Sequence, residues 1–143
     1  MTIGIGSDHK GFILKKDMLD YFSKFGYTMV DYGTSSLESA DYPKYAFLIG
    51  EAVRDQKIDL GILICGTGIG MSIACNKVKK VRCAKVDNLE EASLARLHNN
   101  ANVIAINCNN ENAMEIAKTF IETKFSNEER HIRRIAMIDN YDN

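Results

Sequence analysis

Apolar residues recur along this chain in short blocks that alternate with segments of helical periodicity. Five blocks rich in Ile, Val and Leu have the length of strands. They span residues 2–7, 28–32, 60–65, 81–86 and 103–107. The segments after them place apolar side chains every three or four residues, which is typical of amphipathic helices. These helices are predicted over residues 11–25, 43–55, 71–77, 88–98 and 110–124, with a last one after residue 126 that ends near residue 137.

Residues at the predicted helix starts support these boundaries. Pro43, the only proline, suits the first turn of the second helix. Asn88 with Glu91, and Ser126 with Glu129, have the spacing of capping boxes. Strands that alternate with helices form a parallel sheet covered on both faces. We therefore expect an α/β fold, a three-layer Rossmann-like αβα sandwich with a five-stranded parallel sheet and a C-terminal helix.

Two of the predicted helices indicate which face they bury. The first has an apolar stripe made of Leu14, Met18, Phe22 and Phe25. The fifth has the clearest apolar face of the chain, with Ala113, Ile116, Ala117, Phe120 and Ile121. Both faces are expected to pack on the sheet.

Length and composition limit the classes of protein. With 143 residues, 45% of them apolar, the chain can bury a core of its own, so we expect a single domain over residues 1–143. A formal net charge of −1 argues against nucleic-acid binding. The apolar runs are short and a strand begins near the N-terminus, so we expect neither a membrane span nor a signal peptide. A cytoplasmic protein is the resulting expectation.

The cysteines give no sign of a metal site. They are Cys65, Cys75, Cys83 and Cys108. No CxxC pair and no histidine at ligand spacing accompany them, which argues against zinc and against a disulfide scaffold. We expect free thiols, no metal and no cofactor.

The segment most indicative of function follows the third predicted strand. After Cys65 come three alternating glycines, Gly66, Gly68 and Gly70, and a helix begins directly after them. Successive N–H groups in such a turn, near the positive end of a helix dipole, can bind an anion or a developing oxyanion. The same environment favours the thiolate form of Cys65, which could then act as a base.

Other interpretations of this segment remain open. The glycines could form only a tight turn, and a cysteine at the end of a buried strand is usually a small apolar filler. A dinucleotide-binding turn is a further alternative, with Asp87 as the ribose partner. Gly70, however, comes one position early for the GxGxxG pattern.

Candidate polar residues follow the first strand and the fourth helix. If the strand order begins 2-1-3, Asp8 and His9 face the glycine turn across the crevice where parallel sheets bind ligands. Asp8 could instead be a helix N-cap. His98 ends a predicted helix, where the dipole favours an imidazolium that can donate a proton, although it could simply cap that helix.

Two arginines of the last helix are candidates for anion binding. Arg130 and Arg134 are four residues apart and share a helix face, beside His131. Two guanidinium groups on one face can clamp a phosphate. Alternatively they pair with surface carboxylates such as Glu128.

Seven motifs cover nearly the whole chain. They are GSDHKG at 6–11, DYGT at 31–34, DYP at 41–43, ICGTGIG at 64–70, ARLHN at 95–99, ANV at 101–103 and RHIRR at 130–134. In this order they resemble the motifs of the ribose-5-phosphate isomerase B family. The resemblance implies metal-independent interconversion of D-ribose 5-phosphate and D-ribulose 5-phosphate through an enediolate, as in the non-oxidative pentose phosphate pathway.

The resemblance also implies a role for each candidate residue. Cys65 would be the base that moves a proton between C1 and C2, and the N–H groups of residues 66–70 would stabilise the enediolate. Ring opening would be assisted by Thr67 and His98, with Asp8 nearby to exchange protons with the sugar oxygens. The implied substrate-binding residues are His9, Arg130 and Arg134 for the phosphate, Tyr42 and Asn99 for the sugar, and the glycines Gly66, Gly68 and Gly70.

Members of the family are dimers, often paired into tetramers, with active sites shared between subunits. The resemblance therefore implies a homodimer or tetramer in which the residues of the first strand and the glycine turn meet His98 and Asn99 of the neighbour. Some members accept allose 6-phosphate, and galactose-6-phosphate isomerase subunits share part of the motif set. A non-catalytic sensor of a nucleotide or sugar phosphate and a structural subunit of a hetero-oligomer are the alternatives outside the enzymes.

Overall fold

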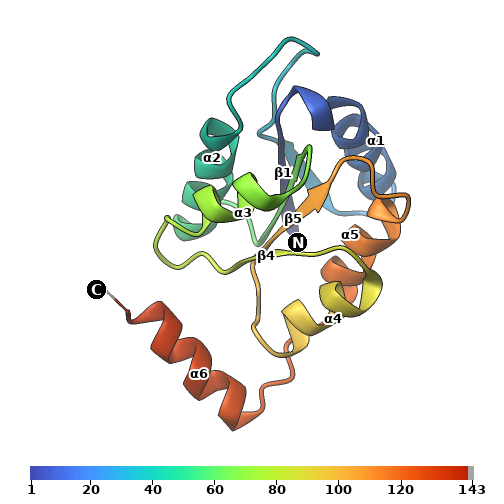
Figure 1. The fold of residues 1–143 in the computed structure, drawn as a ribbon. Helices are drawn as coiled ribbons and strands as arrows, with labels where there is room; N and C mark the ends of the chain where they lie inside the picture. Colours follow the sequence, from blue (N-terminus) through green and yellow to red (C-terminus); the bar gives the residue numbers. More distant parts are fainter. Residues whose placement is uncertain (142–143) are drawn as a thin grey trace.

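Five parallel strands form the sheet at the centre of the computed structural model, which describes residues 1–141 (Figure 1). The strands are β1 (Thr2–Ser7), β2 (Thr28–Asp31), β3 (Leu60–Cys65), β4 (Cys83–Lys85) and β5 (Val103–Asn107). They lie in the order β2-β1-β3-β5-β4, and each neighbouring pair is parallel. The predicted five-stranded parallel sheet is confirmed, and its order meets the 2-1-3 condition on which the predicted crevice depends.

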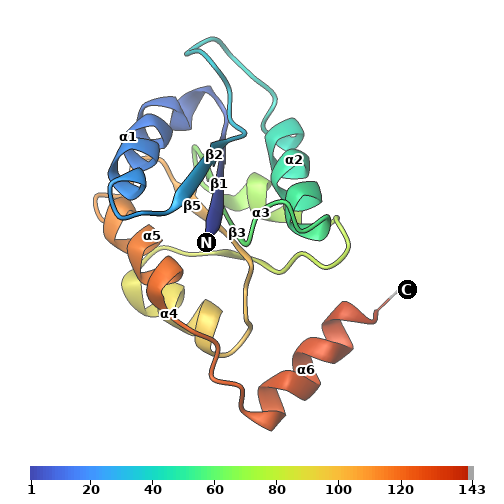
Figure 2. The same ribbon diagram turned by 180° about the vertical axis from the view of Figure 1, so that it is seen from behind.

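Helices cover both faces of the sheet (Figures 1 and 2). One core layer contains side chains of α1 (Phe12–Ser23), α4 (Leu89–Leu97) and α5 (Ala113–Glu122). The other contains side chains of α2 (Tyr42–Arg54) and α3 (Ile69–Cys75). A short 3₁₀ helix, η1 (His9–Gly11), joins β1 to α1. Among the described residues, no helix is long and apolar enough to cross a membrane.

The central strand β3 directs its side chains alternately to the two core layers. All six of its residues are buried. Ile62 and Ile64 pack in the layer of α1, α4 and α5, whereas Leu63 and Cys65 pack in the layer of α2 and α3. The alternation follows from the two-residue period of a strand. Cys65 therefore ends β3 with its thiol on the side of α2 and α3.

A buried lysine fixes the long connection between β2 and α2. The Nζ atom of Lys15 lies 2.9 Å from both carboxylate oxygens of Asp31 and 2.6 Å from the carbonyl oxygen of Thr34. The Lys15 side chain is 1% exposed, so its charge is compensated by these partners. The contacts anchor the start of the 33–41 segment to α1.

The last helix, α6 (Glu129–Asp139), extends from the body of the protein as an arm (Figures 1 and 2). Only His131 and Ile135 of this helix are buried. Ile132 is 48% exposed, Ile138 55% and Met137 70%. The described chain thus leaves apolar side chains of α6 in contact with water.

Some local predictions are wrong. Ser126 and Glu129 form no capping box, because α6 begins at Glu129 with Glu128 at the N-cap position and no side-chain cap. Ser126 Oγ instead accepts a hydrogen bond from the Glu128 N–H at 3.3 Å. Phe25 is 55% exposed, since α1 ends at Ser23 before the stripe can bury it. β4 is also shorter than the predicted 81–86 strand.

Candidate active site

The carboxyl ends of β1 and β3 border a cavity of about 450 Å³. Its walls include Asp8 and Lys10 after β1, Cys65 and Thr67 at and after the end of β3, and Tyr42 at the start of α2. The cavity lies where the strand order reverses, which is the usual ligand site of an open parallel sheet. The predicted meeting of Asp8 with the glycine turn is therefore confirmed, whereas His9 is not among the residues that line this cavity.

The glycine turn, residues 66–70, folds back toward the side chain of Cys65. The Cys65 side chain is 4% exposed, and its Sγ atom accepts a hydrogen bond from the Gly68 N–H at 3.1 Å. Gly68 has a φ of +83°, and a Cβ there would lie 3.2 Å from the carbonyl carbon and oxygen of Ala105. Only glycine adopts this conformation without strain at so close an approach. The turn can therefore bring a backbone donor to the sulfur, where it stabilises negative charge.

Gly70 makes room for Tyr42. A Cβ on Gly70 would lie 2.5 Å from the Cζ atom of Tyr42 and 2.7 Å from its hydroxyl oxygen. The tyrosine ring thus lies directly over the end of the glycine turn. In the same turn, Thr67 Oγ1 accepts a hydrogen bond from the Ile69 N–H at 3.1 Å. The turn, its threonine and the tyrosine line one wall of the cavity.

Asp8 is both a helix cap and a wall of the cavity. Its Oδ1 atom accepts hydrogen bonds from the N–H groups of Lys10 at 3.0 Å and Gly11 at 3.3 Å. The N-cap interpretation of the sequence is therefore confirmed. Asp8 is only 6% exposed, so the two N–H donors compensate a carboxylate that is largely removed from bulk water.

His9 contacts the 33–41 segment through its δ nitrogen. Its Nδ1 atom accepts a hydrogen bond from the Ala40 N–H at 3.1 Å. Because a backbone N–H can only donate, the neutral ring carries its proton on Nε2. The 33–41 segment thus fixes the tautomer of His9 and leaves an N–H donor on the other side of the ring.

Two residues beside Cys65 received no role from the sequence. Lys10 is exposed and crosses the glycine turn, since a Cβ on Gly66 would lie 3.4 Å from its Nζ atom. Cys108 follows β5, and its N–H donates to the carbonyl oxygen of Cys65 at 2.9 Å. Burial and the nearby carboxylate of Asp8 raise the pKa of Cys108. The position of Lys10 directly after Asp8 and His9 could have indicated that it belongs to the site. Cys108 could be placed beside Cys65 only once the pairing of β3 with β5 was known.

His98 and Asn99 lie near the amino ends of the strands, whereas Cys65 lies at the carboxyl end of β3. His98 is the C-cap of α4, which returns from the carboxyl end of β4 toward the amino ends of the strands (Figure 1). The carbonyl oxygen of Asn99 accepts a hydrogen bond from Arg82 Nε at 3.2 Å, just before β4 begins. A single copy of the chain therefore does not bring His98 and Asn99 to Cys65.

The ring of His98 stacks on the ring of His131 from α6. Their centroids are 4.5 Å apart and their planes differ by 14°. His131 is 6% exposed, and its Nε2 atom has no hydrogen-bond partner among the described residues. Burial lowers the pKa of His131, and the charges of His98 and Arg130 lower it further. The neutral form of His131 is therefore favoured in its stack with His98.

The two candidate arginines of α6 are exposed and do not line the Cys65 cavity. Arg130 Nε lies 3.0 Å from Glu128 Oε2, so the carboxylate pairing that the sequence left open is present. Arg134 follows one turn later on the same helix. A half-exposed pair of this kind is weak enough for an anionic ligand to compete with it.

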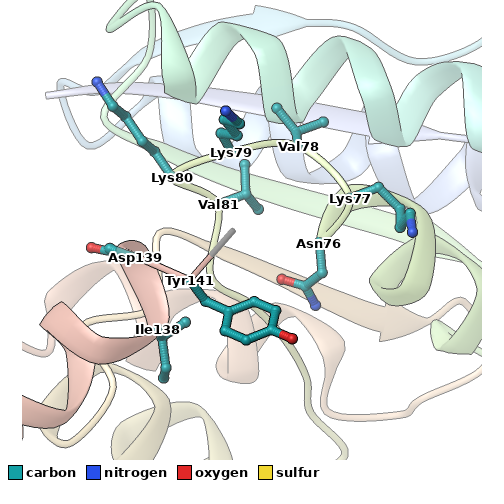
Figure 3. Close-up of a pocket in the computed structure, with 9 residues that line it drawn as sticks. All are labelled: Asn76, Lys77, Val78, Lys79, Lys80, Val81, Ile138, Asp139 and Tyr141. Atoms are coloured by element: carbon teal, nitrogen blue, oxygen red, sulfur yellow. The ribbon is translucent and has the colours of Figure 1, made fainter. Parts of the chain in front are cut away.

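A second cavity, of about 470 Å³, separates the end of α6 from the 76–81 segment (Figure 3). Its walls carry Lys77, Lys79 and Lys80 on one side and Ile138 and Tyr141 on the other. None of the residues predicted for the site lines it. Within residues 1–141, no group of three or more His, Cys, Asp or Glu side chains is arranged to hold a metal ion.

Comparison with known proteins gives consistent matches over almost the whole chain. The model of the family described as Ribose/Galactose Isomerase matches residues 3–138. The putative sugar phosphate isomerase YwlF of Bacillus subtilis is 39% identical and covers 99% of this chain and 97% of its own length. Ribose-5-phosphate isomerase B of Escherichia coli is 41% identical over 84% of this chain and 80% of its own length.

Solved structures match equally well. Ribose-5-phosphate isomerase B of Clostridium thermocellum has a TM-score of 0.93 and 42% identity, with coverage of 97% of this chain and 95% of that one. The enzyme of the same name from Mycoplasma genitalium, solved with bound ribulose 5-phosphate, has a TM-score of 0.92 and 39% identity. That match covers 98% of this chain and 95% of the Mycoplasma chain.

Proposed function

The chain belongs to the ribose/galactose isomerase family, and on that premise we propose that this aldose–ketose isomerase interconverts D-ribose 5-phosphate and D-ribulose 5-phosphate. The observation that carries the proposal is the thiol of Cys65, held by the Gly68 N–H in a cavity that also contains Asp8 and Tyr42. Relatives named ribose-5-phosphate isomerase B supply the substrate class.

In the proposed reaction, the Cys65 thiolate removes the proton from C2 of the open-chain aldose and returns it to C1. A positioned general base contributes about 10²–10⁴ to such a step. The negative charge that develops on the sugar oxygens in the enediolate is stabilised by backbone N–H groups of residues 66–70, a term usually worth about 3–4 kcal/mol per donor. No metal ion takes part in this scheme.

Polar side chains of the same cavity serve the sugar oxygens. Asp8 exchanges protons with the sugar oxygens, Thr67 assists ring opening, and the Tyr42 ring positions the sugar over the glycine turn. The donor on Nε2 of His9, directed by the Ala40 N–H, binds the phosphate. The phosphate lies far from the reacting carbons, and its binding energy fixes their orientation.

The remaining residues come from a second copy of the chain. His98 assists ring opening, Asn99 positions the sugar, and Arg130 with Arg134 clamps the phosphate. Because His98 and Asn99 lie near the amino ends of the strands and Cys65 lies at the carboxyl end of β3, one chain alone does not form this site. Apolar side chains exposed on α6, and on α3 beside the cavity, support a homodimer or tetramer. On α3 these are Ile69, 54% exposed, and Ile73, 65% exposed.

The reaction belongs to the non-oxidative pentose phosphate pathway, and a cytoplasmic location fits such an enzyme. The test compares turnover of D-ribose 5-phosphate and D-allose 6-phosphate by the wild type and by Cys65→Ala, in the presence of a chelator. Chelator-resistant turnover of ribose 5-phosphate that disappears with the thiol supports the proposal. Preferred turnover of allose 6-phosphate reassigns the substrate, and turnover of neither sugar contradicts the proposal and favours a sugar-phosphate sensor.

A further inference from the structure

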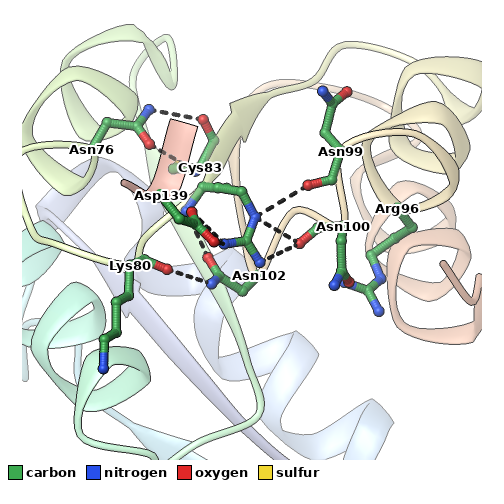
Figure 4. A network of polar contacts seen from close by, with 9 residues as sticks. Asn76, Lys80, Cys83, Arg96, Asn99, Asn100, Asn102 and Asp139 are labelled. Carbon is green, nitrogen blue, oxygen red and sulfur yellow. Dashed lines mark hydrogen bonds and ion pairs between the residues drawn. The ribbon is translucent and has the colours of Figure 1, made fainter. Parts of the chain in front are cut away.

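A network of polar contacts links the turn after α4, with Asn99 and Asn100, to Asp139 at the end of α6 (Figure 4). Arg82 Nη1 lies 2.8 and 2.9 Å from the two carboxylate oxygens of Asp139 on α6. Arg82 Nε donates to the carbonyl oxygens of Asn99 and Asn100, both at 3.2 Å, and Nη2 donates to that of Asn100 at 3.0 Å. The Arg82 side chain is 15% exposed, so these contacts are largely shielded from water.

The backbone of Arg82 is held in place from the next strand. Its N–H donates to Asn102 Oδ1 at 2.8 Å, and its carbonyl oxygen accepts from the Asn102 N–H at 3.1 Å. Asn102 Nδ2 donates in turn to the carbonyl oxygen of Lys80 at 2.8 Å. The guanidinium therefore projects from a fixed point at the start of β4.

The turn that Arg82 contacts ends α4 with a residue in the left-handed region. Asn100 has a φ of +43°, a conformation that a residue with a Cβ adopts only at a cost. Its side-chain oxygen accepts from Arg96 Nη1 at 2.9 Å, and its carbonyl oxygen accepts from Arg82. Two arginines thus reinforce a turn whose backbone also closes on α4, with the Asn100 N–H donating to the Arg96 carbonyl oxygen at 3.1 Å.

The same guanidinium also holds one end of α6. This helix buries only His131 and Ile135, so the Asp139 pair at one end and the His98–His131 stack toward the other are prominent among its contacts with the body. A displaced α6 would move His131 away from His98 and would move Arg130 and Arg134 with it.

We propose that Arg82 is a positioning residue for the isomerase reaction: it holds His98 and the arginines of α6 in one fixed arrangement without touching the substrate. This inference rests on the proposed function. Arginine suits the task because its planar fork can reach a carboxylate and two carbonyl groups at once. The ammonium of a lysine can pair with Asp139 but cannot also reach the carbonyl oxygens of Asn99 and Asn100.

Three variants separate the two contacts of Arg82. Arg82→Lys keeps a cation for Asp139 and loses the carbonyl contacts, so kcat should fall, with a smaller rise in the KM for ribose 5-phosphate because Asn99 positions the sugar. Asp139→Asn leaves the carbonyl contacts and weakens the hold on α6, so the KM should rise with little change in kcat. Arg82→Met should show both effects, with kcat/KM lower by roughly 10- to 100-fold, as expected for small misplacements of binding groups.

The control is Arg54→Met, which removes an exposed arginine paired with its neighbour Asp55 and should leave both constants unchanged. NMR of the histidine rings provides a readout that does not depend on turnover, since the chain has only three histidines. Loss of the stack should shift the ring signals of His98 and His131 in Arg82→Met but not that of His9.

The outcomes separate this inference from the proposed function. A wild type that does not isomerise ribose 5-phosphate overturns the proposed function and with it the role of Arg82 in that reaction, and shifted His98 signals in Arg82→Met would then support only its structural hold on His98 and α6. An active wild type whose Arg82 and Asp139 variants keep kcat, KM and the histidine signals overturns the positioning role alone. If Arg82→Met does not fold, Asp139→Asn and Arg82→Lys decide, because each retains half of the network.

Discussion

The N–H of Gly68 lies 3.1 Å from the Sγ atom of Cys65, so the thiol and the glycine turn form one structural unit. The contact depends on the φ of +83° at Gly68, which lets the chain fold back on the end of β3. The proposed base at the end of a buried strand is thereby placed beside the backbone donors that would serve the enediolate. This arrangement leads to the first prediction.

Cys65→Ala should lose turnover while it retains substrate binding. Without the base, kcat should fall by about 10²–10⁴, and the affinity for ribose 5-phosphate, measured by calorimetry, should stay close to that of the wild type. Cys83→Ala is the matched control, because this buried thiol does not line the cavity. It should keep kcat and lose only stability. A Cys65→Ala protein with near-wild-type kcat would contradict the assignment of the base.

Two inactive variants should restore activity when they share a dimer. In a mixed dimer of Cys65→Ala and His98→Asn, one site carries both substitutions and the other carries neither. Co-expressed in equal amounts, the two should recover about a quarter of the wild-type activity, since half of the dimers are mixed and each has one intact site. The control pair, Cys65→Ala with Asp8→Asn, should recover none, because both residues line the cavity of one chain. No recovery in the first mixture would place His98 outside a shared site.

Lys10→Met should reduce both the rate and its sensitivity to salt. The exposed ammonium beside Gly66 attracts an anionic substrate, and mobile ions screen exposed charges over about 8 Å at physiological salt. The expected result is a lower kcat/KM whose slope against ionic strength is shallower than that of the wild type. Lys16→Met, on the exposed side of α1, is the control and should keep the wild-type slope. Parallel slopes for wild type and Lys10→Met would exclude this role.

Lys15→Met should destabilise the fold without entering the chemistry. The Thr34 carbonyl would lose its buried partner, while Asp31, whose side chain is 47% exposed, could still be hydrated. We expect the free energy of unfolding in urea to fall by about 1–3 kcal/mol, the usual cost of an unsatisfied buried group. Lys16→Met should change it by less than about 0.5 kcal/mol. An equal effect of both variants would contradict the structural role of Lys15.

Acidification should destabilise the packing of α6 through His131. Its pKa is lowered in the folded protein by burial, by His98 and by Arg130 and Arg134, against an opposing effect of Glu128. The unfolded chain therefore binds more protons near its ordinary pKa of about 6.5, so stability is retained above that pH and lost as pH falls below it. The unfolding midpoint should drop more steeply between about pH 7 and pH 5.5 for the wild type than for His131→Asn. Identical profiles of the unfolding midpoint against pH for the two proteins would show that His131 does not cause the loss of stability in acid.

Much of the architecture follows from local patterns in the sequence. The alternation of Ile62 and Ile64 with Leu63 and Cys65 predicts a strand buried on both faces, and strand–helix alternation predicts the parallel sheet. The capping pair of Asn88 and Glu91 is also present, with the Glu91 N–H donating to Asn88 Oδ1 at 2.8 Å. These features depend on residues close together in the chain, so periodicity and spacing are enough to predict them.

The sequence by itself determined the sheet, the glycine turn and the list of candidate residues, because each is encoded in a short segment. Tertiary structure alone decided which of them meet. One cavity contains Asp8, Tyr42 and Cys65 because β1 and β3 are neighbours. His98 lies near the other ends of the strands because α4 runs back along the sheet. The contacts of Arg82 with Asn100 and Asp139 join residues 18 and 57 positions away, and such pairings depend on strand order and helix placement, which no local pattern records.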